Sequence, residues 1–131
     1  MLISKGRGYV YGIEYHIVFC VKYRKKIIDD NIKKSLLQIF TLLSEDIGFT
    51  ILEVNTDLEH VHLLISCKPQ HYIPDIVKRL KGTSARWLFQ LYPELKKELY
   101  GGHLWNPSYF IATVSDTLEE NIKEYIYNQG K

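Results

Sequence analysis

The chain has 131 residues, which suits one domain with a hydrophobic core, and we expect a single domain over residues 1–131. Its 46% hydrophobic and 24% charged residues are typical of a globular protein. No apolar stretch approaches the roughly 20 residues of a membrane helix, and the first residues lack the apolar segment of a secretory signal. We therefore expect a cytoplasmic protein with no membrane partner, in which Cys20 and Cys67 are reduced core residues.

The first predicted element is a half-buried strand over residues 9–21. Aromatic and aliphatic side chains occupy every second position, and Glu14 and His16 point the other way. One face of this strand is therefore expected to join the core.

A helix and a second strand follow. Asp29 or Asp30 can cap a helix whose apolar residues recur at helical spacing, and Gly48 is suited to end it. Residues 49–57 alternate again and predict a strand.

Residues 60–67 form the most informative strand. Its apolar face consists of Val61, Leu63, Ile65 and Cys67. Its other face consists of His60, His62, Leu64 and Ser66, because side chains alternate with period two. The connection at residues 57–59 is short, which predicts an antiparallel hairpin with the preceding strand.

The remaining elements are a helix, a strand and a final helix. Pro74 lies in the first turn of the helix, which ends close to Pro93. Residues 104–114 predict a fourth strand, and Pro107 places it at an edge or gives it a bulge near its start.

Ser115 or Asp116 can cap the final helix, predicted at about 117–129. The order is βαββαβ plus one C-terminal helix. This is the α+β, ferredoxin-like (RRM-like) split βαβ pattern, an antiparallel sheet with two helices on one face. The apolar face of residues 60–67 must meet those helices, so His60 and His62 are expected on the open face.

Tyr125 and Gln129 are four residues apart and share one face of the final helix. With His60 and His62 they suggest a metal-dependent phosphoryl-transfer site. Each feature also has a simpler interpretation. The histidines would be surface residues of a sheet, Tyr125 a core tyrosine and Gln129 a surface amide.

Two groups of cations stand out in a chain of net charge +2. The first comprises Lys22, Arg24, Lys25 and Lys26, and the second Lys78, Arg79, Lys81 and Arg86. Such clusters suit contacts to nucleic-acid phosphates. Their alternative interpretation is a solvated loop and a solvated helix face.

Taken together, the sequence resembles the single-tyrosine HUH transposases of small insertion sequences that move as single-stranded DNA, including the REP-associated tyrosine transposases. The resemblance covers nearly the whole chain. Its motifs are residues 15–24, the His60-Val61-His62 motif, and residues 79–84, 104–114 and 125–129.

The resemblance implies a DNA nuclease and strand transferase. His60, His62 and Gln129 would hold a divalent metal, Mg²⁺ or Mn²⁺. Tyr125 would attack the scissile phosphate, leaving a 5′-phosphotyrosine and a free 3′-OH. It also implies a homodimer with active sites assembled in trans, acting on single-stranded DNA with hairpin-containing ends.

Two other functions are compatible with parts of the pattern. A replication initiator or relaxase shares the HUH chemistry but is usually larger. A non-catalytic, RRM-like nucleic-acid-binding domain would use its open sheet face for stacking. That second interpretation leaves the combination of His60, His62, Tyr125 and Gln129 unexplained.

Overall fold

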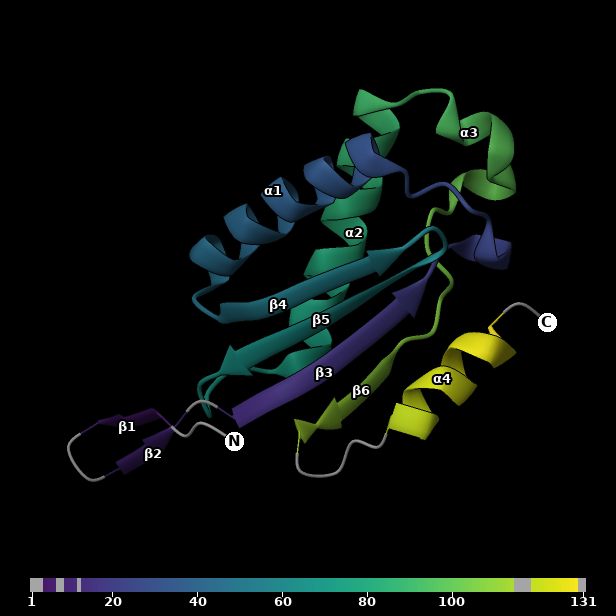
Figure 1. Ribbon diagram of the computed structural model, residues 1–131. Helices are drawn as coiled ribbons and strands as arrows, with labels where there is room; N and C mark the ends of the chain where they lie inside the picture. The colour runs from purple at the N-terminus through teal and green to yellow at the C-terminus, as the bar shows by residue number, and fades with distance from the viewer. Residues whose placement is uncertain (1–3, 7–8, 12, 115–118, 130–131) are drawn as a thin grey trace.

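The computed structural model describes residues 4–6, 9–11, 13–114 and 119–129. Its main sheet contains β3 (Ile13–Cys20), β4 (Thr50–Asp57), β5 (His60–Cys67) and β6 (Phe110–Thr113). The strand order is β4-β5-β3-β6, and each neighbouring pair is antiparallel. Helices α1 (Asp30–Ile47) and α2 (Ile73–Leu91) cover one face of this sheet (Figure 1). The predicted split βαβ fold is confirmed.

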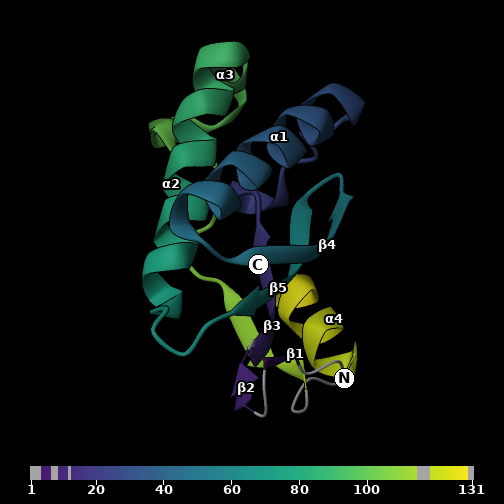
Figure 2. The same cartoon turned by 90° about the vertical axis from the view of Figure 1, so that its left-hand side faces the viewer.

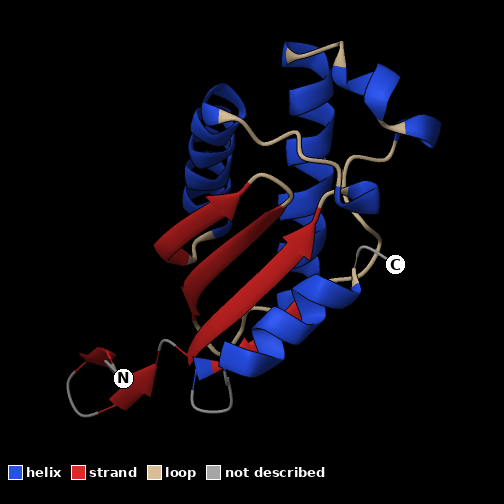
Figure 3. Cartoon of the chain, turned by 45° about the vertical axis from the view of Figure 1, so that its right-hand side comes forward, coloured by secondary structure: helices blue, strands red, loops and turns tan. Residues whose placement is uncertain are grey.

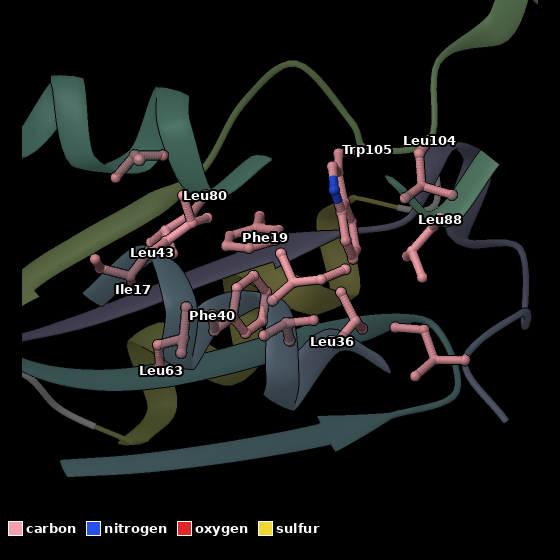
Figure 4. Packing of buried hydrophobic residues seen from close by; sticks show 14 of the residues in the cluster. Ile17, Phe19, Leu36, Phe40, Leu43, Leu63, Leu80, Leu88, Leu104 and Trp105 are labelled. Carbon is pink, nitrogen blue, oxygen red and sulfur yellow. The ribbon is translucent and has the colours of Figure 1, made fainter. Parts of the chain in front are cut away.

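The core lies between the sheet and these two helices. Strand β5 alternates strictly, so that Val61, Leu63 and Ile65 are fully buried and His60 and His62 are half-buried. Figure 4 shows Leu63 packed among side chains of the other core elements. These include Ile17, Phe19, Leu36, Phe40, Leu80 and Leu88. The predicted orientation of the two histidines is therefore confirmed.

The predicted signals at both ends of α1 and at the start of α2 are also confirmed. The Asp29 Oδ1 atom accepts a hydrogen bond of 2.9 Å from the Ile32 amide and caps α1. Gly48 ends α1 with a φ of 98°, a left-handed conformation that a side chain would disfavour. Pro74 lies in the first turn of α2 as expected.

The first strand is shorter than predicted. Residues 9–11 form β2 (Tyr9–Tyr11), which pairs with β1 (Ser4–Gly6) in a separate two-stranded sheet. Strand β3 begins at Ile13, which lies opposite Cys67 at the end of β5. Residues before Ile13 therefore have no partner on β5, and the strand of residues 9–21 is divided.

The fourth strand is also shorter than predicted, because β6 begins only at Phe110. Trp105 is anchored in the core, where its Nε1 atom donates a 2.9 Å hydrogen bond to Ser84 Oγ, and it forms an isolated bridge with Val21. Pro107 lacks an amide hydrogen and interrupts the pairing that follows. The edge position that Pro107 predicted is confirmed.

The named elements of the described residues include short helical segments that were not predicted. They are η1 (Lys22–Arg24), α3 (Leu95–Glu98) and η2 (Tyr100–Gly102). Within the part of the chain that the structure describes, no helix is long and apolar enough to cross a membrane.

The final helix, α4 (Glu119–Asn128), lies on the face of the sheet away from α1 and α2, alongside β3 and β6 (Figures 1–3). The predicted caps at Ser115 and Asp116 fall outside the described residues. Gln129 follows directly after the helix, and its amide bonds the Ile126 carbonyl at 3.2 Å. The open sheet face of this chain thus receives its own last helix.

Candidate active site

His60 is oriented by a buried carboxylate. Its Nδ1 atom lies 2.8 Å from Oε1 of Glu59, a residue only 8% exposed. A carboxylate on one ring nitrogen fixes the tautomer and leaves the other nitrogen as a ligand, which is the usual environment of a metal-binding histidine. Strand β5 therefore presents an imidazole that is prepared for coordination.

His62 has a second histidine as its partner. Its Nε2 atom lies 2.7 Å from Nδ1 of His16, which comes from the neighbouring strand β3. Burial lowers the pKa of His62, and the nearby His16 and His60 lower it further. His62 is thus held neutral, in the form that binds metals.

Tyr125 and Gln129 meet at one serine. Ser108 Oγ lies 3.1 Å from the Tyr125 hydroxyl and 2.9 Å from Gln129 Oε1. The serine has a single hydrogen, and its neighbours Gln129 Oε1 and Asn106 Oδ1 are both acceptors. Either hydroxyl can be the donor between Ser108 and Tyr125, so the single Ser108 hydrogen has three possible acceptors.

The phenol of Tyr125 is half-buried against β6. Its ring centroid lies 5.7 Å from that of Phe110. Burial raises the pKa of Tyr125, and the hydrogen bond with Ser108 partly opposes this effect. The phenol is therefore neutral at pH 7, and its proton must leave before or during any nucleophilic attack.

The four predicted site residues form two pairs on one sheet face. His60 and His62 lie on β5, whereas Tyr125 and Gln129 lie near β6, and β3 separates these strands. Among the described residues, no hydrogen bond links either histidine to Tyr125 or Gln129.

A tighter group of candidate metal ligands surrounds His60. Ligand atoms of Asp57, Glu59 and His60 all lie within 4.8 Å of one another. Carboxylate oxygens suit Mg²⁺ and Mn²⁺, and imidazole suits transition metals. The donor chemistry around β5 therefore fits a divalent cation.

The predicted basic residues differ in their surroundings. Lys25 and Lys26 are exposed after η1, and Lys22 and Arg24 are half-buried. On α2, Arg79 Nη2 forms an ion pair of 2.8 Å with Asp46, and Arg86 is exposed. The cations that line one surface hollow along α2 are Lys78, Arg79 and Arg86.

Lys81 points into the protein instead. Its Nζ atom donates to the carbonyl oxygens of Asn106 at 2.6 Å and Ser108 at 3.0 Å. The ammonium also lies 5.9 Å from the ring centroid of Phe19 and 5.8 Å from that of Tyr109. Burial lowers the pKa of Lys81 to about 8, so it remains largely charged at pH 7. Lys81 thus fixes the turn that carries Ser108.

Three polar partners of the site were not assigned a role from the sequence. Glu59 is adjacent to His60 in the sequence, and His16 lies on the polar face of its strand. The local sequence could therefore have suggested both as partners of the site. Ser108 carried no such local signal, because its contacts with α4 depend on two segments that meet only in the fold.

The comparisons with known proteins agree on one family. The family model described as "Transposase IS200 like" matches residues 9–129. The chain is 46% identical over 127 residues to the ISDra2 transposase TnpA of Deinococcus radiodurans, covering 97% of this chain and 91% of that protein. It is 28% identical over 119 residues to the transposase for insertion sequence element IS200 of Salmonella typhimurium, covering 91% and 78%.

Solved structures give the same result for the fold. A crystal structure described as a putative transposase from Deinococcus radiodurans has a TM-score of 0.87 and 43% identity, covering 97% of this chain and 98% of that chain. A REP-associated tyrosine transposase bound to a REP hairpin shares the fold, with a TM-score of 0.59 and 14% identity over 97% and 68% of the two chains.

The internal position of Lys81 leads to a stability prediction. Lys81→Met keeps an unbranched side chain beside Phe19 and Tyr109 but removes two hydrogen bonds to carbonyls. We expect the free energy of unfolding, measured by urea denaturation at pH 7, to fall by about 1–3 kcal/mol. The control is Lys78→Met on the exposed face of α2, which we expect to change it by less than about 0.5 kcal/mol. Equal stability of the two variants would contradict the structural role of Lys81.

Proposed function

The chain belongs to the family of IS200-like transposases, and on this basis we propose that it cleaves and rejoins single-stranded DNA at insertion-sequence ends through a phosphotyrosine at Tyr125. The observation that supports the proposal best is the position of α4. It carries a half-buried tyrosine to the same sheet face from which His60 and His62 project. A phenol, two imidazoles and an amide on one face are the parts that such a reaction needs.

The covalent step exchanges one phosphodiester for another. A bond forms between the Tyr125 oxygen and phosphorus while the bond from phosphorus to the DNA 3′ oxygen breaks. The phenolic proton is lost, and the leaving oxygen ends as a free 3′-OH. Because the bond types are equivalent, a different 3′-OH can reverse the step and join new DNA without ATP.

A divalent cation, Mg²⁺ or Mn²⁺, would be held by His60, His62 and Gln129, with Asp57 and Glu59 as neighbouring carboxylates. When bound, it supplies positive charge that offsets the charge developing on the phosphate oxygens. The neutral state of His62 and the orientation of His60 by Glu59 support this assignment.

The DNA would be positioned by cations in and after η1 and on α2. We assign phosphate contacts to Lys22, Lys25, Lys26, Arg79 and Arg86, and leave Lys81 out because its ammonium is committed to two carbonyls. The expected substrate is single-stranded DNA with hairpin-containing ends. The hairpin in the REP-associated relative supports this choice.

The first test concerns the nucleophile. Tyr125→Phe removes only the phenolic oxygen, so we expect it to abolish covalent protein–DNA adducts and to preserve DNA binding. Tyr127, which is 63% exposed on another side of α4, is the matched control, and Tyr127→Phe should still form adducts.

Adducts are measured by denaturing gel after incubation with end-labelled single-stranded DNA from the ends of the element that encodes the chain. Adducts that persist in Tyr125→Phe and vanish in Tyr127→Phe would move the nucleophile to Tyr127. No adduct with any variant or with the unaltered chain would favour a non-catalytic nucleic-acid-binding domain.

The second test concerns the metal ligands. His60→Ala and His62→Ala should abolish cleavage and weaken Mn²⁺ binding, measured by calorimetry, at least tenfold. Gln129→Ala should have a smaller effect. Neither histidine variant should unfold, because Val61, Leu63 and Ile65 remain in the core.

Asp57→Asn distinguishes the two candidate ligand sets. If it weakens Mn²⁺ binding more than His62→Ala does, the cation belongs to the group of Asp57, Glu59 and His60. Unchanged cleavage by both histidine variants in the presence of EDTA would contradict a metal site altogether.

The third test concerns assembly of the proposed homodimer. If Tyr125 acts on the partner's histidines, co-expression of a His60→Ala chain with a Tyr125→Phe chain should restore cleavage. One site of the mixed dimer is then intact and the other carries both defects, so we expect about half of the normal activity per heterodimer. A purified heterodimer without cleavage would instead place each Tyr125 in the site of its own chain.

A further inference from the structure

Arg24 lies close to the start of β5, the strand that carries His60 and His62. It ends η1, which directly follows β3, and the Val21 amide at the start of this turn donates a 2.8 Å hydrogen bond to the Glu59 carbonyl. One residue earlier, Cys20 stands opposite His60 in the sheet. The turn that carries Arg24 is therefore attached to the end of β5 that carries His60.

The Arg24 side chain reaches the helix that carries Tyr125. Its Nη1 atom donates to the Tyr127 carbonyl oxygen at 3.3 Å, near the end of α4. Tyr127 lies two residues after Tyr125 and two before Gln129. Arg24 thus connects the turn attached to β5 with the helix that carries the proposed nucleophile.

The charge of this guanidinium is poorly compensated. Its Nε atom is buried and has no hydrogen-bond partner among the described residues. Neither of the two ion pairs found in that part of the chain includes Arg24. A guanidinium keeps its charge and offers five N–H donors, so burial without an acceptor is costly. An anion bound to this guanidinium would compensate its charge.

The backbone of the turn is strained as well. Tyr23 and Arg24 have φ values of 59° and 52°, the left-handed region that non-glycine residues rarely adopt. Such a conformation is energetically costly and persists where the surrounding structure imposes it. Here the Arg24 amide is tied to the Val21 carbonyl at 2.7 Å. In this conformation of the turn, the Arg24 side chain reaches α4.

We propose that Arg24 is a catalytic residue whose guanidinium binds the non-bridging oxygens of the scissile phosphate. The planar guanidinium matches two phosphate oxygens at once, and its terminal nitrogens offer donors beyond the one that bonds the Tyr127 carbonyl. Its positive charge offsets the charge that develops as the Tyr125 oxygen attacks. This inference rests on the proposed cleavage reaction and adds a role that the exposed lysines of the same turn do not share.

A purely structural role of Arg24 would have different consequences. Arginine near the end of a helix can stabilise it by binding a terminal carbonyl. In that case the loss of Arg24 would loosen α4, which hydrogen exchange of the α4 amides would detect. A phosphate-binding role instead requires the guanidinium during the reaction, even when α4 stays in place.

The experiment compares Arg24→Lys and Arg24→Ala with the unaltered chain in single-turnover cleavage. Saturating single-stranded DNA from the ends of the encoding element is the substrate. We expect Arg24→Lys to form adducts about 10²-fold more slowly, because it keeps the charge but loses the paired donors. Its dissociation constant for the same DNA in EDTA should change less than threefold. Added guanidinium should partly restore Arg24→Ala.

Lys33→Ala, which removes an exposed cation on α1, serves as the control and should react at the normal rate. Normal rates for Arg24→Lys would overturn the inference. So would a slow Arg24→Ala that guanidinium does not rescue and whose α4 amides exchange faster. If Arg24→Ala does not fold, the cleavage rate of Arg24→Lys alone tests the inference. Failure of the unaltered chain to form any adduct would reject the proposed function itself, independently of Arg24.

Discussion

Strand β5 has one face packed in the hydrophobic core and an opposite face that carries His60 and His62. The position of the other candidate site residues depends on this alternation. Its inward residues Val61, Leu63 and Ile65 are fully buried. Burial of each such side chain contributes about 1.5–3 kcal/mol, so shifting the strand by one residue would forfeit roughly 5–9 kcal/mol. This approaches the whole stability of a small domain. The register of β5 is therefore fixed, and with it the face of His60 and His62.

The opposite face is completed by side chains from distant segments. Val18 and Cys20 of β3 lie on the same side as His16 and are fully buried. They are not part of the hydrophobic core between the sheet and helices α1 and α2. Helix α4 lies on this side of the sheet, in front of β6 and beside β3 (Figure 3). Burial raises the pKa of Cys20 to about 11, so the thiol stays neutral beside His60 and does not compete as an anionic ligand.

The sequence predicted the parts of the structure that depend on local pattern. The alternation of residues 60–67, the cap at Asp29 and the stop at Gly48 each follow from neighbouring residues, and each is confirmed. The order of elements was enough to predict the sheet topology. Local pattern could not show that residues 9–11 leave the main sheet, because this depends on where β5 ends.

The polar contacts of the site were less predictable for the same reason. Lys81 belongs to a helical run of cations, and only the fold brings its ammonium to the carbonyls of Asn106 and Ser108. Likewise, Ser108 meets Tyr125 across 17 residues and Gln129 across 21. Sequence spacing placed Tyr125 and Gln129 on one helix face, but it could not identify the serine that holds both.

The attachment of α4 is much weaker than that of α1 and α2. None of its residues 122–128 is fully buried, whereas α1 and α2 each bury several apolar side chains in the core. The contacts of α4 and of Gln129 after it include the ring of Phe110 with that of Tyr125, the Ser108 hydroxyl and one long bond from Arg24. Elements with little apolar burial open at lower free energy than the core. We therefore expect α4 to detach from the sheet face at a lower free energy than unfolding of β5 requires, which would leave His60 and His62 in place.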